Sequence, residues 1–512
     1  MQDKNVINRE YARELLRKNI VNGILRIPEG VTWIEKEAFF GMDKSFCSGR
    51  KNVDVIIPKS VINIGCNAFQ NAKFIKNLFF EPRDEELVID MGAFNYSSVE
   101  KVVLPRLVRI ESYAFADCVK LKSVSFTEKL PEEKSTDSVP IIIGHAAFEE
   151  CARIDTFEFP SDVKVRIKER AFHASSIKEL IVKSDSEIEQ QAFLWCKQLK
   201  KARIEGDTSI MYGAFENCIN LESVKICTEN ETGIKIGSGS FRYCYKLSKL
   251  SVKNGWISEV ESNAFSFCKK FQSVDLSHVK VISDYAFMHC SSLESVACSS
   301  AEKIGKAAFS GCTSLKNVEL TDTVTTISDV AFCSTAISQI YLSDNITEIG
   351  EAAFACCKWL ECVRIPKLIQ KIYRKTFSEC VSLYAIEFAD DSALCKIGSC
   401  AFEHCHSIYR ITIPSKVFKI STKAFYECTN LMDVEFENSE DPMVICDEAF
   451  SLCVSIGSIT LPQTLSEIGS RTFFGCSSLK VVKLKGGWPK SVGQDAFSEC
   501  PLDKILLKDE RD

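Results

Sequence analysis

The sequence predicts a β-rich, curved right-handed solenoid with one parallel strand per repeat, single helical turns and a short N-terminal capping helix. The first supporting observation is a phrase that recurs along the 512 residues, as "IGKAAFSGCTSLKNVEL" (304–320), "IGEAAFACCKWLECVRI" (349–365) and "IGSCAFEHCHSIYRITI" (397–413). The second is the alternation of apolar and polar residues at the end of each phrase, which indicates a half-buried strand. Because such a short unit cannot bury its apolar edge alone, the units are expected to stack into one continuous core.

A phenylalanine that follows Ala or another small residue anchors the repeat. It occurs 20 times, with a mean spacing of 24.1 residues between Phe39 and Phe497. A spacing of roughly 20–29 residues with a core of spaced leucines is typical of leucine-rich repeats. The anchors are Phe39, Phe69, Phe94, Phe115, Phe148, Phe172, Phe193, Phe215, Phe241, Phe265, Phe287, Phe309, Phe332, Phe354, Phe377, Phe402, Phe425, Phe450, Phe473 and Phe497.

Each part of the repeat has its own local signal. In "LKNVEL" (315–320), Val318 and Leu320 point to one side and the polar residues between them to the other. A Ser or Gly follows the Ile of the "I-G" segment, as at Gly305, and suits a helix N-cap. We therefore expect the Ala-Phe-x-x-Cys motif to form a single helical turn.

The domain organisation follows from the unbroken phase of the repeat. Residues 22–508 are predicted to form a single solenoid of about 20–21 repeats, since no Pro/Gly/Ser-rich linker interrupts them. Residues 1–21 are predicted to form the capping helix, because "NREYARELLRKNI" (8–20) places Tyr11, Leu15 and Leu16 on one helical face. Residues 509–512 form a charged tail. The polar insertions are expected to be exposed loops; they are "MDKSFCSGRKN" (42–52) and "TEKLPEEKSTDSVP" (127–140).

The repeat phrase resembles that of the BspA-like leucine-rich repeat proteins, I-G-x-x-A-F-x-x-C-x-x-L-x-x-V-x-L-P, over about residues 22–508. The resemblance implies a leucine-rich-repeat solenoid and a surface protein of a bacterium or anaerobic protist that binds host or partner proteins. The N-terminal residues "MQDKNVINREYARELL" have no apolar signal-peptide core, and no apolar run reaches the roughly 18 residues of a membrane span. On these grounds we expect a cytoplasmic location, with surface display or export by another route as the alternative.

Fifteen of the 25 cysteines occupy one repeat position, three residues after the anchor Phe. The other five repeats hold Met42, Ala72, Ser97, Ser175 and Thr335 there, so the position selects a small or soft residue. Stacked side chains lie roughly 5 Å apart, whereas a disulfide needs Cβ atoms at roughly 3.5–4.5 Å. We therefore predict a ladder of reduced packing cysteines in a reducing compartment.

The sequence offers no constellation for catalysis or for a cofactor. Residues 395–406 contain Cys395, Cys400, His404, Cys405 and His406, but without the paired spacing of a zinc site. No phosphate-binding loop, metalloprotease helix or nucleophile elbow is present. We predict no enzyme activity, no cofactor and no metal, and an enzyme is only a remote alternative. The mild net charge of −6 also argues against nucleic-acid binding.

A partner is expected to bind on the outward positions of the strands, because these positions vary while the core positions repeat. Three groups on them are candidate binding residues, and for each the competing interpretation is ordinary solvated strand surface. They are Lys201, Arg203, Lys225 and Lys249 (the basic block), Tyr341 and Arg364 (the aromatic–cation pair), and Ile56, Phe79 and Val103 (the apolar strip). The basic block would suit an acidic protein partner.

The predicted function is non-catalytic protein–protein recognition by a monomeric scaffold with an extended solenoid surface. The alternatives are a structural, self-assembling protein that associates through its C-terminal edge, and a surface adhesin of the repeat type.

Overall fold

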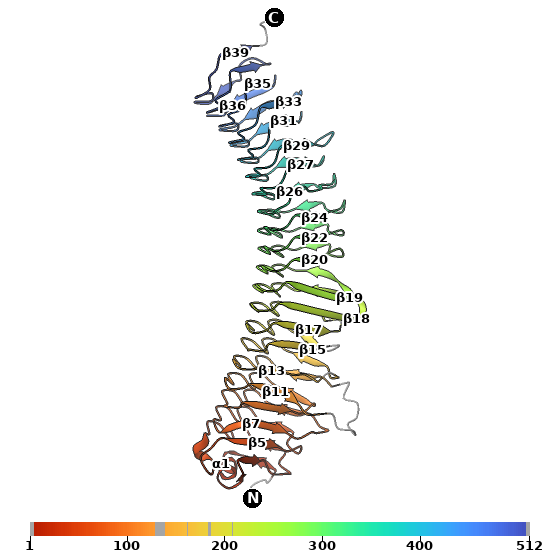
Figure 1. Cartoon of the computed structure of the whole chain (residues 1–512), viewed down its shortest axis with the longest axis vertical. Coiled ribbons are helices and arrows are strands. Elements are labelled where there is room, and N and C mark those ends of the chain that lie inside the picture. The colour runs from red at the N-terminus through yellow and green to blue at the C-terminus, as the bar shows by residue number, and fades with distance from the viewer. Residues whose placement is uncertain (1–4, 129–138, 161, 183–185, 207, 508–512) are drawn as a thin grey trace. The chain divides into compact units, whose positions relative to one another are not determined.

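The computed structural model describes residues 5–128, 139–160, 162–182, 186–206 and 208–507. They belong to two compact units, residues 1–257 (unit 1) and 258–512 (unit 2), and each unit is a stack of repeats built on parallel strands (Figure 1). The predicted fold class is confirmed in these terms. Most of the predicted loop at 127–140 lies outside the described residues, and the division into 1–21, 22–508 and 509–512 stays a prediction.

Each repeat typically contributes two strands, one more than predicted. The longer strand is the one expected from the alternating segment, except that the repeat of Tyr341, where a strand was also expected, has none at this place. We call the outward positions of the longer strands, together with Tyr341, the strand face. The shorter strand ends at the Ile of the "I-G" segment, where two or three residues pair with the repeats on either side. Two parallel strands per turn give most repeats two ladders of backbone hydrogen bonds to their neighbours.

In unit 1 the longer strands form a seven-stranded sheet with the order β13-β11-β9-β7-β5-β3-β2, in which only β2 is antiparallel to its neighbour. Its members are β2 (Ile20–Val21), β3 (Ile24–Arg26), β5 (Val53–Ile57), β7 (Ile75–Phe80), β9 (Lys101–Leu104), β11 (Ser123–Phe126) and β13 (Thr156–Phe157). The longer strands that follow are β15 (Glu179–Val182), β17 (Lys201–Glu205), β18 (Ser223–Ile236) and β19 (Lys249–Val260), the last with residues in both units. The shorter strands form an eight-stranded sheet of β1 (Val6–Ile7), β4 (Trp33–Ile34), β6 (Asn63–Ile64), β8 (Leu87–Ile89), β10 (Val108–Ile110), β12 (Ile141–Ile143), β14 (Val165–Ile167) and β16 (Glu187–Ile188).

In unit 2 the longer strands fall into four separate groups. They are β20 (Ser273–Asp275), β22 (Ser295–Ala297) and β24 (Asn317–Glu319); β27 (Cys362–Ile365) and β29 (Ala385–Phe388); β31 (Arg410–Ile413) and β33 (Asp433–Phe436); and β35 (Ser458–Leu461), β37 (Val481–Leu484) and β39 (Lys504–Leu507). The shorter strands are β21 (Val281–Ile282), β23 (Lys303–Ile304), β25 (Thr326–Ile327), β26 (Glu348–Ile349), β28 (Lys371–Ile372), β30 (Lys396–Ile397), β32 (Lys419–Ile420), β34 (Met443–Ile445), β36 (Leu465–Ile468) and β38 (Ser491–Val492).

The predicted N-terminal helix is present as α1 (Arg9–Lys18). The side chain of Asn8 caps it by accepting hydrogen bonds from the backbone N–H groups of Glu10 and Tyr11, at 3.1 and 3.0 Å. Leu15 and Leu16 are buried, as expected for the inner face of an amphipathic helix. The insertion at 42–52 contains one short 3-10 helix, η1 (Lys44–Phe46).

The prediction of a helical turn over the Ala-Phe-x-x-Cys motif is wrong. Outside α1 and η1, the described residues contain no helix. Alternate N–H groups of the motif bond within the turn, as from Cys312 to the carbonyl of Phe309 (3.1 Å). The N–H groups between them bond to the next repeat, as from Phe309 to the carbonyl of Ala331 (2.8 Å). The corner is therefore a run of β-turns that also carries rungs between repeats, and a helix would have kept all these bonds inside one repeat.

These turns need left-handed backbone. In all 20 repeats the residues two before and two after the anchor Phe have positive φ. Val330 is one of them, with φ of 60°. A β-branched residue is strained in this region, and the surrounding hydrogen bonds hold it there.

Val330→Asn is therefore expected to stabilise unit 2 by about 1 kcal/mol, because Asn tolerates left-handed backbone. Chemical denaturation measures the effect. The matched control is Val281→Asn, at a valine that lies in strand β21 and is 44% exposed; there the change is expected to destabilise, because Asn disfavours strands. Equal effects at both positions would contradict the strain at Val330.

The anchor phenylalanines form the core of each unit. Successive rings stack nearly parallel, with centroids 4.5–5.5 Å apart in unit 1 and 5.1–5.5 Å apart in unit 2. All but Phe497 are fully buried. The core is thus one column of offset-stacked rings per unit, which is why the same residue recurs at the same place.

The cysteine ladder lies beside this column and is reduced. All 25 cysteines fall within the described residues, and each is a free thiol. At least fourteen ladder cysteines donate a hydrogen bond to the carbonyl of the anchor Phe in the preceding repeat, at 3.0–3.2 Å. Cysteine is therefore both a small core residue and an S–H donor, and the donor role was not predicted. Ser97 and Thr335 also place a hydroxyl near a ladder thiol, at 3.3 Å in each case.

Candidate partner-binding surfaces

The strand face presents alternate residues of each longer strand to solvent. In β17, for example, Lys201 and Arg203 are exposed while Ala202 and Ile204 are buried. The parallel register places equivalent residues of neighbouring repeats side by side across this face. Equivalent side chains of neighbouring repeats therefore leave the backbone about 5 Å apart and form one continuous surface.

The apolar strip is brought together as predicted. Ile56 is aligned with Phe79, and Phe79 with Val103, on the adjacent strands β5, β7 and β9. All three side chains are half-buried. Arg26 and Ser125 are aligned with the two ends of the strip, so it is three residues wide and bounded by polar groups. A strip of this size contributes to binding only as part of a larger surface.

The basic block is also brought together. Arg203 is aligned with Lys225, and Lys201 with Ser223. The N–H of Ser248 bonds to the carbonyl of Glu222 (3.0 Å), which places Lys249 beside Ser223. The four cations therefore lie on three successive strands, and all are exposed.

The structure adds an acidic residue to this block. The guanidinium of Arg203 forms an ion pair with Glu205 of the same strand, with 2.6 Å between Nη2 and Oε1. Glu179 on β15 is aligned with Lys201. Both carboxylates reduce the repulsion among the cations, so the crowding of positive charge does not by itself require an acidic partner.

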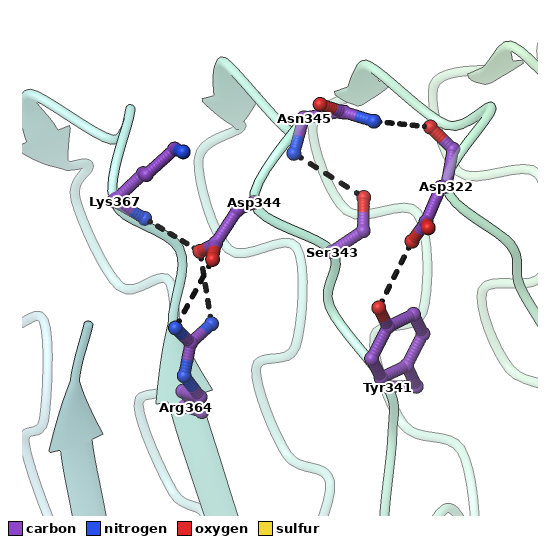
Figure 2. A network of polar contacts seen from close by, with 7 residues as sticks. All are labelled: Asp322, Tyr341, Ser343, Asp344, Asn345, Arg364 and Lys367. Carbon is purple, nitrogen blue, oxygen red and sulfur yellow. Dashed lines mark hydrogen bonds and ion pairs between the residues drawn. The ribbon is translucent and has the colours of Figure 1, made fainter. Parts of the chain in front are cut away.

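Tyr341 and Arg364 are each held by a carboxylate from the preceding repeat, as Figure 2 shows. The Tyr341 hydroxyl donates to Asp322 Oδ1 at 2.9 Å. Arg364 donates to both oxygens of Asp344, at 2.9 and 3.1 Å, in a bidentate pair. The backbone N–H of Lys367 donates to the same Asp344 carboxylate at 3.1 Å. Tyr341 is 59% exposed and Arg364 is also exposed, so both are oriented by neighbours and open to a partner.

These contacts shift the pKa values of Tyr341, Asp344 and Arg364. The hydrogen bond to Asp322 raises the pKa of Tyr341, because a phenolate beside a carboxylate is disfavoured. The hydrogen bonds from Arg364 lower the pKa of Asp344, and those to Asp344 raise that of Arg364. Sequence reasoning missed both carboxylates, since they come from another repeat, 19 and 20 residues upstream of their partners.

Arg364→Gln is expected to raise the pKa of Asp344 toward its ordinary value of 3.8. In the parent protein this pair stabilises the fold above pH 3.8 and loses its effect as the pH falls through the lowered pKa. A carboxylate titration by carbon-13 NMR checks this. In the control Arg374→Gln, which removes the partner of Glu351 at 3.1 Å, the Asp344 midpoint is expected not to move. An unchanged midpoint in Arg364→Gln would contradict the pairing.

The cysteine–histidine cluster does not converge on one point. His404 Nδ1 contacts Glu427 Oε2 at 2.8 Å, and His406 Nδ1 lies 3.0 Å from the Glu427 carbonyl. Cys395 donates to the carbonyl of Gln370, and Cys405 to that of Phe377, each at 3.1 Å. Across the described part of the chain, no group of three or more His, Cys, Asp and Glu residues is placed to hold a metal ion.

The family is decided by a match along the chain. The model described as "BspA type Leucine rich repeat region (6 copies)" matches residues 19–136, 132–234, 208–301, 280–395 and 395–511. The chain belongs to this family. The resemblance seen in the repeat phrase is thereby confirmed for this BspA-type leucine-rich repeat protein.

Solved structures of other repeat proteins are similar at low identity. A leucine rich cell surface protein from Faecalibacterium prausnitzii is 24% identical and covers 64% of this chain and 84% of its own, with a TM-score of 0.36. A leucine-rich repeat protein from Bacteroides ovatus is 23% identical and covers 79% of this chain and 86% of its own, with a TM-score of 0.38. Comparison with curated proteins finds no match. No helix among the described residues has the length and apolar character needed to cross a membrane.

Proposed function

We propose that this BspA-type repeat protein is a non-catalytic scaffold that recognises a protein partner through its strand face. The observation that carries the proposal is the arrangement of Tyr341 and Arg364. Tyrosine and arginine are enriched among the residues that dominate protein–protein affinity. Here both are exposed, and both are fixed by carboxylates that a core-packing role does not require.

Fixing an exposed side chain before binding lowers the entropy that is lost when the partner arrives. The bidentate pair between Arg364 and Asp344 fixes the guanidinium plane and leaves it open on one side for stacking or for a further acceptor. The apolar strip and the basic block lie at the same outward positions in other repeats. A protein partner with several contact points fits this distribution better than a small molecule does.

The double variant Tyr341→Ala/Arg364→Ala is expected to reduce capture of the native partner at least about tenfold, as loss of two hot-spot residues does. Quantitative affinity capture from the native cells, with mass spectrometry, measures the loss. The matched control is Lys306→Ala/Lys358→Ala, two exposed residues of the turns in the same unit. Equal capture by all three proteins would exclude this pair, and a loss with Arg203→Glu/Lys225→Glu would assign binding to the basic block instead.

The second candidate function, self-assembly through the C-terminal edge, rests on the last described repeat. Ile505 of β39 is 38% exposed, whereas Val482, its neighbour in register on β37, is 1% exposed. A core side chain left this open favours contact with another apolar surface. Growth of the molar mass with concentration in light scattering would support assembly, and a constant monomer mass supports recognition.

A further inference from the structure

The longer strands of unit 2 do not form one continuous sheet. Strand β27 pairs with β29, and β31 with β33, but the described residues show no ladder between β29 and β31 or between β33 and β35. The strand face is therefore split here at two places only two repeats apart, in addition to the break between β24 and β27. Backbone N–H and C=O groups that are paired between the other longer strands face the splits.

A proline follows the second strand at each split. The N–H of Glu437, just after β33, donates to the carbonyl of Ile413 at 3.0 Å and ties β33 to β31. The corresponding residues after β31 and β35 are Pro414 and Pro462, which have no N–H to donate. The strand that ends in proline thus lacks this tie to the strand before it.

Each split opens into a groove on the strand face. The first groove, with a volume of about 370 Å³, lies between β29 and β31 and is lined by Tyr384, Glu387 and Tyr409. The second, of about 720 Å³, lies between β33 and β35 and is lined by Asp433, Glu435 and Thr460. Thr412 and Glu437 line both grooves, which makes them neighbours on one surface.

The grooves are mainly acidic, although Lys485 also lines the second groove. The strands and following loops of this region, residues 384–392, 409–416, 433–441 and 458–462, carry eight carboxylates and two cations. Their net charge of −6 equals that of the whole 512-residue chain. Arg410 is already engaged, because its guanidinium contacts both Asp433 (3.3 Å) and Glu435 (2.6 Å).

We propose that the strand face from β29 to β35 binds a cationic, arginine- or lysine-bearing polypeptide segment. Charge complementarity selects the partner: cationic side chains enter the two grooves and meet Glu387, Glu435 and Glu437. Tyr384 and Tyr409, which are 45% and 54% exposed at the rim of the first groove, offer ring faces to the same cations. The inference deepens the proposed function, since it assigns the chemistry of a partner to a second part of the strand face.

The test uses the full chain and a fluorescein-labelled nona-arginine peptide, with binding followed by fluorescence anisotropy at low salt. The variant Glu435→Gln/Glu437→Gln keeps one acceptor oxygen on each side chain, which at position 437 can still take the Ser415 N–H that the carboxylate accepts at 2.9 Å, and removes two charges. It is expected to weaken binding about fivefold, and Thr460→Trp, which fills the second groove without changing charge, is expected to weaken it as well. The matched control Glu348→Gln/Glu467→Gln removes two exposed charges from the shorter strands and is expected to change binding less than about twofold.

Two outcomes would overturn the proposal. One is a parent protein that does not bind the peptide, or binds it no better than the groove variants do. The other is a dimer of the parent protein, seen by mass photometry, that Glu435→Gln/Glu437→Gln dissociates, because the face would then belong to a second copy of the chain. Neither outcome involves Tyr341 or Arg364, so the proposed function would stand or fall separately by the capture experiment.

Discussion

Cys312→Asp is expected to destabilise unit 2 by about 3–5 kcal/mol, because the carboxylate would be buried without a cationic partner. Cys312 is fully buried, and burial alone raises the pKa of its thiol to about 12. An anion is therefore strongly disfavoured at this place. The thiol donates a hydrogen bond to the carbonyl of Phe287 at 3.1 Å, and an ionised carboxylate cannot donate to that oxygen.

The controls separate charge from packing. Cys312→Ser keeps a donor for the Phe287 carbonyl, and Cys312→Ala keeps a small apolar side chain. Both are expected to cost less than about 2 kcal/mol, since that carbonyl also accepts the N–H of Cys290 at 3.1 Å. Denaturant titrations of the three variants give the order, and an aspartate variant as stable as the serine variant would refute the packing role of the ladder.

Phe309→Ala is expected to cost about 3–5 kcal/mol, the usual effect of deleting a buried aromatic ring. The ring is fully buried, and its centroid lies 5.4 Å from that of Phe287 and 5.5 Å from that of Phe332. Its removal leaves a gap in the column that neither neighbour can close, because each is fixed in its own repeat.

Denaturation followed by circular dichroism measures this change. The matched control is Phe40→Ala, since Phe40 follows an anchor Phe but is itself 38% exposed. That change is expected to cost less than about 1 kcal/mol. Similar losses at both positions would mean that the stacked column does not carry the stability of the repeat.

The core could be predicted from sequence because stacking makes each repeat pose the same packing problem. The spacing of three residues between Phe309 and Cys312 recurs in most repeats, and both side chains are buried. The N-terminal helix was predictable for a similar reason, since the spacing of Leu15 and Leu16 is a local property of a helix.

The turns were not predictable in the same way. Ten of the 40 positive-φ positions around the anchors hold Gly or Asn, too few to reveal left-handed backbone, and the others include Val330. The bonds that stabilise these turns run to the next repeat, as from Gly311 to the carbonyl of Cys333 at 2.8 Å. The sequence of one repeat suggests a helical turn, because it cannot show that the backbone N–H groups bond to carbonyls of the next repeat.

The candidate surfaces were predictable in position but not in partners. Alternation placed Arg364 and the other outward strand residues on the strand face, because side-chain direction in a strand has period two. Tyr341 is exposed as predicted, although its segment forms no strand. Which carboxylate meets which cation depends on the register between repeats, so Asp322 and Asp344 could not be assigned. The grooves were missed as well, since a proline such as Pro414 marks the end of a strand without showing that the neighbouring strand is released.

The most direct test of partner recognition through the strand face is site-specific photo-crosslinking in the native cells. A benzoylphenylalanine replaces Tyr341 on the strand face in one variant and exposed Lys358, one residue after ladder Cys357, in the other. Strand-face recognition predicts a discrete protein adduct at position 341 and none at position 358. An adduct at position 358 alone would contradict it and would place the interface on the turns.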